Sequence, residues 1–524
     1  MRPVPGTFIP MNIFLYTISI TLAIFMPVAA AMALRRRFNV AWSLFCVGMA
    51  TFIGSQLFHI PLNNWLTDIG AIGDVAPDAA NLLVTVAVLG LSAGLSESIA
   101  RAVGYAILFR RGAAAQREDG IMVGLGHGGI EAMLIGGVLA AASASSLWAL
   151  QGMDLATLEL SAVELTAVTE QLALITAAPY LAFLPLLERA LAILLHVVLS
   201  LLVWTAFKRR RGRWVVAAVL YHAFVDSSIV YAAQFVENMW LLEGMLALLL
   251  LPGAIWLWKV WPSTPHRPIA PLRQDVGLFL TAVSHECRYQ WQSKRLLILV
   301  VVFILFGLMS PLVAKFTPEI LKSIEGAEQF ADLIPEPSIA DAMGQYIKNI
   351  TQFGFILAIV MGMGAVAGEK ERGTAAIVLS KPLPRWAFLM SKFVAQTAVF
   401  AVSFLAAALG AYYYIMLLFE PIPLAPFLAM NGLLLLWLLV FSAVTLLAST
   451  IGRTTAVSAG IAFGGAVLLF IVGIIPKWGG LAPSGLIAWA SDGSLVNGGA
   501  VAMSVVLIVV LLITAVAVFE KQEL

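Results

Sequence analysis

The 524-residue chain contains few cysteines and few charged residues. Its two cysteines, Cys46 and Cys287, exclude a disulfide framework and a CxxC metal knuckle. Charged residues make up only 11% of the chain and the formal net charge is +2, so nothing indicates nucleic-acid binding. The ATP-binding pattern GxxxxGK[ST] and the zinc-protease pattern HExxH are both absent from the sequence. ATP hydrolysis linked to this chain would therefore need a separate subunit.

Hydrophobic residues are abundant instead, at 61% of the chain, and the mean hydropathy is +0.95. This composition is typical of a polytopic membrane protein. Runs of about 20 apolar residues are long enough to cross a bilayer, and they predict an all-α protein with about 13 transmembrane helices, about seven before a polar break and about six after it. The predicted spans lie near residues 11–34, 39–60, 81–109, 121–147, 189–207, 214–235, 239–258, 297–315, 351–367, 388–417, 428–451, 454–474 and 498–518.

The distribution of Lys and Arg predicts how these spans are oriented. The first run resembles a signal peptide, but arginines at residues 35–37 follow it and almost no positive charge precedes it, so we interpret it as a spanning helix with the N-terminus outside. Loops 61–80 and 149–188 contain acidic residues and no Lys or Arg, and are predicted to face outward, with residues 175–187 interfacial or re-entrant. The C-terminus is predicted to be cytosolic. The chain is thus expected to be a multi-pass protein, surrounded by lipid, in the cytoplasmic membrane of a prokaryote.

A proline-rich break separates two predicted domains. Residues 261–275, "WPSTPHRPIAPLRQD", contain four prolines and cannot continue a helix. They are predicted to be a cytosolic linker between domains at residues 1–260 and 276–524. Apolar residues at helical spacing among polar neighbours then predict an amphipathic helix on the cytosolic surface, and these residues are Val276, Phe279, Leu280, Val283 and Cys287.

Three of the first seven spans contain pairs of ionisable residues at i, i+4 spacing. A charge within the hydrocarbon region costs about 2.5–3.5 kcal/mol on insertion scales, so such residues indicate a functional or structural need. The spacing places both members of a pair on one helix face. All six lie roughly 9–18 Å below the predicted cytosolic surface at 1.5 Å per residue, so they can form one cluster that opens to the cytosol. The pairs are Glu97 with Arg101, His127 with Glu131, and His222 with Asp226.

Structural alternatives exist for each of these features. A single ion pair can simply hold membrane helices together, although three pairs at one depth favour a functional site. His196 lies at a similar depth and could join the cluster, but a lone histidine is better explained as a packing residue. Four glycines around His127 follow no strand, so they predict close helix packing that admits a substrate backbone rather than a phosphate loop. They are Gly124, Gly126, Gly128 and Gly129.

The chemistry of the cluster suits hydrolysis in one of two ways. Glu97 could take a proton from water beside the fixed charge of Arg101, while the histidines stabilise the oxyanion. The same cluster could instead hold a divalent metal, because three ligands and a water make a catalytic zinc site. Spacing alone does not decide between a base and a metal. The alternative metal ligands are His127, Glu131, His222 and Asp226.

The motifs "SESIAR", "GHGGIEAM" and "YHAFVD" resemble those of the glutamic intramembrane proteases. This is the clan of the CAAX prenyl endopeptidases and bacterial CPBP proteins, and the resemblance, over about residues 10–258, is greatest to its YhfC-like branch. It implies that Glu97 activates water, that His127 and His222 bind the oxyanion or orient the water, and that Asp226 supports them.

One position departs from the pattern of this clan. The clan's EExxxR motif falls on Ser96, Glu97 and Arg101, so a serine stands where the first glutamate is expected. The departure leaves two candidates for the base, Glu97 and Glu131.

A second resemblance covers about residues 270–524. Residues 368–392, "GEKERGTAAIVLSKPLPRWAFLMSK", could be a solvated loop, but they resemble the first cytosolic loop of ABC type 2 permeases, which docks on the ATPase. The resemblance implies a partner ABC ATPase that binds ATP and Mg, and a homodimer of this chain with two such subunits. The matching residues are Glu371, Arg372, Gly373, Thr374, Leu379, Ser380, Pro382, Arg385 and Lys392.

Together these features predict the membrane subunit of an ABC exporter fused to an intramembrane endopeptidase of the glutamic type. Such a protein would cleave a precursor peptide and export the product. Two alternatives stay open: the first half is a non-catalytic peptide-binding, lipid-binding or immunity module of a pure permease, or its cluster is a metal or proton site of a transporter. The chain is expected to bind no cofactor itself, unless the cluster holds a divalent metal.

Overall fold

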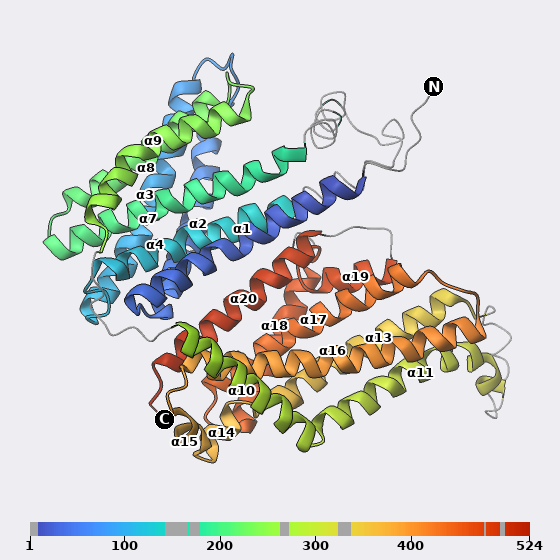
Figure 1. The fold of residues 1–524 in the computed structure, drawn as a ribbon. Coiled ribbons are helices and arrows are strands. Elements are labelled where there is room, and N and C mark those ends of the chain that lie inside the picture. The colour runs from blue at the N-terminus through green and yellow to red at the C-terminus, as the bar shows by residue number, and fades with distance from the viewer. Residues whose placement is uncertain are drawn as a thin grey trace. The chain divides into compact units, whose positions relative to one another are not determined.

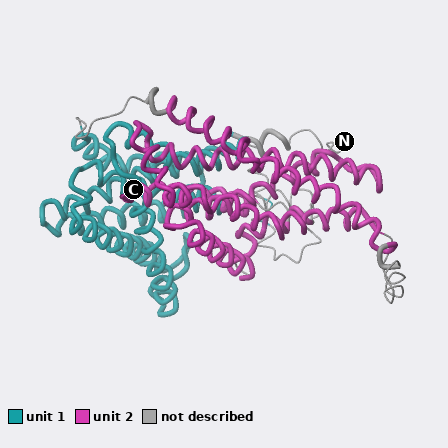
Figure 2. Tube along the Cα trace, turned by 90° about the horizontal axis from the view of Figure 1, so that it is seen from below, with its two compact units in different colours: residues 1–270 teal, residues 271–524 magenta. Residues whose placement is uncertain are grey.

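The structure is a computed structural model that describes residues 9–141, 166, 169, 179–262, 272–322, 337–475, 478–492 and 498–523. All regular elements in these ranges are helices (Figure 1). Thirteen of them are long and apolar enough to cross a membrane, which confirms the predicted all-α class and number of spans. The chain divides into two compact units, residues 1–270 and 271–524, coloured separately in Figure 2. Most of the predicted linker lies outside the described residues.

Unit 1 contains seven of the span-length helices. Its fourth span begins as an α-helix and continues as a π-helix, and its fifth is preceded by a 3₁₀ turn. The elements are α1 (Ile9–Phe38), α2 (Trp42–Asp68), α3 (Leu82–Arg110), α4 (Arg117–Ala132), η1 (Met133–Leu139), η3 (Pro179–Phe183), α7 (Leu184–Arg209), α8 (Arg213–Ala232) and α9 (Met239–Val260).

The described part of the segment predicted to be interfacial or re-entrant, residues 175–187, is helical. Residues 184–187 form the first turn of α7, which continues without interruption to Arg209. Pro185 is compatible with this position because the first turn of a helix needs no backbone N–H donor. Residues 175–178 lie outside the described part of the chain.

Helix α4 occupies the interior of unit 1, where it packs against α1, α2 and α7. The glycines of α4 permit this close packing. At two of them, Gly124 and Gly126, a side chain would collide with the backbone of a neighbouring helix. A Cβ on Gly126 would lie 2.0 Å from the carbonyl oxygen of Phe45, and a Cβ on Gly124 would lie 2.6 Å from the Cα of Val197. The motif around His127 is therefore buried at the centre of the unit, as close helix packing requires.

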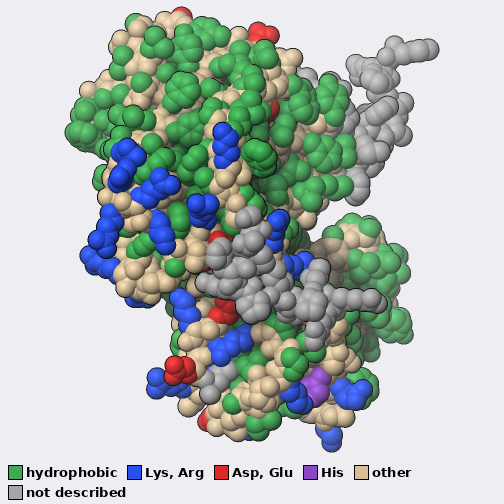
Figure 3. All heavy atoms as spheres, turned by 60° about the vertical axis from the view of Figure 1, so that its left-hand side comes forward, with side chains coloured by type: hydrophobic (Ala, Val, Ile, Leu, Met, Phe, Trp, Pro, Cys, Tyr) green, Lys and Arg blue, Asp and Glu red, His purple; other side chains and the backbone are tan. Residues whose placement is uncertain are grey.

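The Lys and Arg side chains of unit 1 gather towards one end, while much of its visible face is hydrophobic (Figure 3). Polar contacts join the segments at this end: Lys208 donates to the carbonyl oxygen of Ala115 at 3.0 Å, and Arg117 to that of Val260 at 3.3 Å. The positive-inside rule predicts that this end is cytosolic.

Unit 2 contains the other six span-length helices. Its first helix, α10, is polar on average and packs along α16, in the place where the amphipathic helix is predicted. The core between the spans is rich in aromatic side chains such as Phe303, Phe400 and Trp437. The elements are α10 (Leu272–Gln292), α11 (Arg295–Lys322), α13 (Ile339–Gly362), α14 (Ala367–Glu371), α15 (Thr374–Leu379), α16 (Arg385–Leu418), α17 (Leu424–Ile451), α18 (Thr455–Ile474), α19 (Ser484–Asp492) and α20 (Gly498–Glu520).

Candidate functional site

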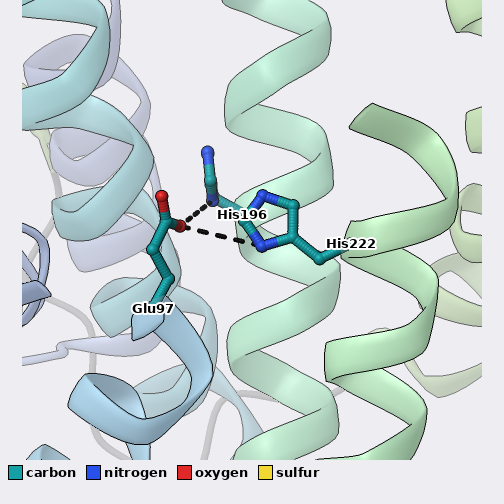
Figure 4. Close-up of side chains that lie close together, drawn as sticks. All are labelled: Glu97, His196 and His222. Atoms are coloured by element: carbon teal, nitrogen blue, oxygen red, sulfur yellow. Dashed lines mark ion pairs between the residues drawn. The ribbon is translucent and has the colours of Figure 1, made fainter. Parts of the chain in front are cut away.

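Four helices of unit 1 bring buried ionisable side chains together around Glu97. The Oε2 atom of Glu97 on α3 accepts a hydrogen bond from Nη2 of Arg101 at 3.1 Å and lies 3.1 Å from Nε2 of His127 on α4. The same oxygen lies 3.7 Å from Nδ1 of His196 on α7 and 3.8 Å from Nδ1 of His222 on α8. Figure 4 shows both of these imidazoles beside the carboxylate. We refer to these five residues as the Glu97 cluster.

Two carboxylates contact the Nε2 atoms of His196 and His222. Nε2 of His196 contacts a carboxylate oxygen of Glu131, and Nε2 of His222 lies 3.2 Å from Oδ2 of Asp226. Glu131 is held in turn by Arg189, whose Nη1 donates to Oε1 at 3.1 Å. His196 and His222 each therefore present Nδ1 to Glu97 while a carboxylate fixes Nε2.

His127 is oriented by a different group. Its Nδ1 is hydrogen-bonded to Oγ1 of Thr51 on α2 at 2.9 Å, which directs Nε2 towards Glu97. Its ring also lies 5.2 Å from the ring of His196, measured between centroids. Arg101 completes the arrangement, because Nη2 donates to Nδ1 of His196 at 2.6 Å as well as to Glu97. The imidazoles thus have little freedom to turn.

The structure brings the six predicted site residues into one region, and the members of two of the three predicted pairs contact each other. Glu97 contacts Arg101 and His222 contacts Asp226, whereas His127 and Glu131 point to different neighbours. Asp226 is the most accessible, with a side chain 33% exposed.

Three residues of the site are missed or misjudged by the sequence analysis. His196 contacts both Glu97 and Glu131, so the interpretation as a packing residue is wrong. Its depth, which matches that of the predicted pairs, is the signal that could have found it. Thr51 and Arg189 carry no such signal, because each lies in a helix with no predicted site residue and acts across a helix interface.

The donors around Glu97 fit a divalent metal. Glu97, His196 and His222 each offer a ligand atom, and these atoms lie within 4.8 Å of one another. Nδ1 of His222 is buried and has no hydrogen-bond partner among the described residues. Two imidazoles and one carboxylate form a known zinc-binding set, and a carboxylate on the far nitrogen of a ligating histidine is its usual support. Of the predicted ligands only His222 is in this set, because Glu131 and Asp226 stand behind the histidines.

Comparison with known proteins finds one family match in each half of the chain. Residues 22–246 match the family described as YhfC intramembrane metalloprotease, and residues 280–483 match the ABC-2 family transporter protein. The chain joins a YhfC-like membrane protease domain to an ABC-2 permease domain. This confirms the YhfC-like and the ABC type 2 resemblances, whereas a glutamic type of catalysis stays a prediction. The Glu97 cluster lies entirely within the YhfC-like domain.

Two proteins of Bacillus subtilis (strain 168) are similar to parts of the chain. The "Uncharacterized transmembrane protein YxlG" is 29% identical over 206 residues, which cover 38% of this chain and 80% of that protein. The "Uncharacterized membrane protein YhfC" is 25% identical over 242 residues, which cover 45% of this chain and 92% of that protein. No solved structure matches the chain.

In the ABC-2 permease domain, residues 368–392 form two short helices and the start of α16. Gly373 joins α14 to α15 with φ of +71°, in the left-handed region that favours glycine. Ile377 on α15 is 66% exposed. The matched residues that are exposed are Glu371, Arg372, Gly373, Ser380 and Pro382.

Three of the matched residues make polar contacts within unit 2. Arg385 Nη1 donates to the carbonyl oxygens of Phe519 and Gln522 at 2.7 Å each, so it holds the end of α20. Oγ1 of Thr374 donates to the Glu369 carbonyl oxygen at 3.2 Å. Glu371, although exposed, accepts from Thr455 Oγ1 at 3.2 Å.

Lys392 links α10 to the same segment. Its buried Nζ donates to Oε1 of Glu286 on α10 at 2.7 Å and also contacts the carboxylate of Glu369 on α14. One lysine therefore ties the amphipathic helix, the start of the 368–392 segment and the spanning helix α16 together.

Proposed function

We propose that the YhfC-like domain is an intramembrane endopeptidase whose hydrolytic centre is the Glu97 cluster. The observation that carries the proposal is the convergence of three imidazoles and one guanidinium on a single buried carboxylate. Ionisable groups are costly in a bilayer interior, and their usual justification there is chemistry or transport. Hydrolysis of a peptide bond needs a base and oxyanion donors in one place, and this cluster contains both.

In the first form of this mechanism, Glu97, His196 and His222 would hold a divalent metal. Glu131 and Asp226 then orient the two imidazoles through Nε2, and His127 donates to the substrate oxyanion from a position fixed by Thr51. When bound, the metal would polarise the scissile carbonyl as a Lewis acid. The unpartnered Nδ1 of His222 and the carboxylates behind both ligand histidines support this form.

The second form is a glutamic mechanism without metal. It is favoured by Arg101, whose Nη2 already occupies Nδ1 of His196 at 2.6 Å. Glu97 would take a proton from water as the water oxygen attacks the scissile carbonyl, while His127 and His222 would donate to the oxyanion. Glu97 would then return the proton to the leaving amine as the C–N bond breaks. Glu97 suits the role of base better than Glu131, since Arg189 and His196 engage both oxygens of Glu131. Within the described residues, the contacts of Glu97 all use Oε2, which leaves Oε1 for a water.

Cleavage and metal content measured on the same preparation test both forms. The purified full-length chain is incubated with short precursor peptides encoded beside its gene, with and without a chelator, and its metal content is determined. The metal form predicts about one bound divalent ion and loss of cleavage with chelator, whereas the glutamic form predicts unchanged cleavage. Glu97→Gln should abolish cleavage in either form, and Glu237→Gln, an exposed carboxylate outside the cluster, should not. Binding without cleavage by the wild type would instead support a non-catalytic module.

For the ABC-2 permease domain we propose that it exports the cleaved peptide as a homodimer, with ATP hydrolysed by a partner ABC ATPase. The exposed residues between 371 and 382 are the proposed docking surface for that subunit. Arg372→Glu should reduce co-purification of the ATPase at least tenfold. Lys348→Glu changes a cation that is also exposed but lies in the first half of α13, far along the helix from this segment, and it should leave co-purification unchanged. Equal retention of the ATPase by both variants would refute this docking surface.

A further inference from the structure

A cavity of about 470 Å³ lies at the Lys/Arg-rich end of unit 1, among the ends of α4, α7, α8 and α9. Its lining combines tryptophan rings with cationic side chains and includes no residue of the Glu97 cluster. The volume is within the range of small-molecule sites. Because the cavity is distinct from the hydrolytic centre, it needs a separate explanation.

The aromatic part of the lining is ordered and contains an unused donor. The rings of Trp214 and Trp256 stack with centroids 6.3 Å apart. Trp204 is fixed by its Nε1, which donates to the carbonyl oxygen of Ala114 at 3.0 Å. By contrast, Nε1 of Trp214 is buried and finds no acceptor within the described part of the chain. A buried N–H without an acceptor is costly, so a ligand oxygen at this point would be stabilised.

The cationic side chains of the lining are held in place by contacts other than ion pairs with the described carboxylates. Two of the cations are tethered through backbone carbonyl oxygens, Lys208 to Ala115 and Arg117 to Val260. The guanidinium of Arg209 lies 5.8 Å from the Trp214 ring centroid. None of the three cations pairs with a carboxylate among the residues that the structure describes, and Glu118 is the one acidic residue of the lining. The cavity therefore carries an excess of positive charge.

We propose that this cavity binds the phosphate headgroup of an anionic phospholipid. The cavity lies at the ends of spanning helices, where lipid headgroups meet the protein, and tryptophan is the aromatic residue enriched at that level. Basic pockets between transmembrane helices on the cytoplasmic side are suited to anionic headgroups, and the positive-inside rule predicts that this end is cytoplasmic. A zwitterionic headgroup would bind less well, because its ammonium group would lie beside the same cations and be repelled by them.

The proposed lipid site and the hydrolytic centre share two helices without overlapping. Helix α4 contributes Arg117 to the cavity and His127 to the cluster, and α7 contributes Lys208 and His196. At 1.5 Å per residue, these positions are roughly 15–18 Å apart along each helix. Lipid binding can therefore be measured independently of peptide cleavage.

Native mass spectrometry of the delipidated full-length chain in detergent tests the proposal. Dioleoyl phosphatidylglycerol should bind at least tenfold more tightly than dioleoyl phosphatidylcholine. Removing two cations with Lys208→Gln and Arg209→Gln should weaken phosphatidylglycerol binding about 25-fold, at about fivefold per charge. The matched control is Arg36→Gln with Arg37→Gln, which removes the same charge from exposed positions outside the cavity and should have little effect.

A more conservative variant tests the same proposal if the double variant does not fold. Trp214→Phe retains an aromatic ring but removes the unpartnered Nε1 donor, and should weaken phosphatidylglycerol binding about fivefold. Equal binding of the two lipids, or an equal loss in the control pair, would overturn the proposal. Glycerol phosphate that competes as tightly as the lipid would also overturn it, because the ligand would then be a soluble phosphate.

Discussion

Replacing Gly126 by alanine should separate α2 from α4 and disturb the Glu97 cluster. The new Cβ would lie 2.0 Å from the carbonyl oxygen of Phe45, a backbone atom that cannot turn aside. An ordinary contact needs about 3.4 Å, so the two helices must move apart by roughly 1 Å or more. Overpacking of this kind costs about 1–3 kcal/mol. Since His127 is the next residue, the same shift should lower peptide cleavage by about 100-fold.

The matched control is Gly54→Ala on α2, where a Cβ would meet nothing within 4 Å. Alanine is the better helix former by about 1 kcal/mol, so this variant should be as stable as the wild type or slightly more stable. Unfolding in sodium dodecyl sulfate, followed by tryptophan fluorescence, gives the free energy of unfolding of each variant, and the peptide assay gives the rate. Equal stability and equal cleavage for the two variants would refute the packing role of the glycines.

Three further predictions concern single polar contacts. Lys392→Met should destabilise unit 2 by about 3 kcal/mol, because it leaves the carboxylates of Glu286 and Glu369 without their shared cation. The control, Lys381→Met at an exposed position, should change the free energy of unfolding by less than about 0.5 kcal/mol. Tyr346→Phe should cost about 1–2 kcal/mol in the same measurement, because the buried hydroxyl donates to Oδ1 of Asn431 at 2.7 Å. Thr51→Val should lower the rate of cleavage at least tenfold and the free energy of unfolding by only about 1 kcal/mol, because valine cannot form the hydrogen bond to Nδ1 of His127. A loss of stability without a loss of cleavage would assign this hydroxyl a purely structural role.

Much of the architecture could be predicted because membrane spans have a strong local signal. Hydropathy alone predicts about 13 spans, and the part of the chain that the structure describes contains 13 helices of the required length and composition. The fifth span is predicted near residues 189–207, whereas α7 begins at Leu184, with Pro185 in its first turn. The terminus orientation stays a prediction from the positive-inside rule.

The candidate site could be located from the sequence, but its contacts could not be assigned. The i, i+4 pattern finds residues on one face of one helix, and it correctly pairs Glu97 with Arg101. Contacts between helices leave no such pattern. His196 is a lone histidine in an apolar helix, and Arg189 lies 58 residues from its partner Glu131. The contacts that these two residues make with Glu131 become visible only when α4 and α7 pack together.

The 368–392 segment shows the same limit in the permease domain. Its resemblance to an ATPase-docking loop treats Arg372 and Arg385 alike, but the structure separates them. Arg372 is exposed, whereas Arg385 donates to backbone carbonyls at the end of α20, more than 130 residues along the chain. Only the exposed residues are available to a partner subunit.

Cleavage of a precursor peptide by the Glu97→Gln variant is the most direct test of the central claim. Glutamine occupies almost the same volume as glutamate but can neither take a proton from water nor contribute a negative charge to a metal site. If the Glu97 cluster is the hydrolytic centre, the variant should fold and bind the peptide but show no measurable cleavage, while Glu237→Gln cleaves at the wild-type rate. Cleavage by Glu97→Gln at the wild-type rate would contradict the assignment in both its metal and its glutamic form.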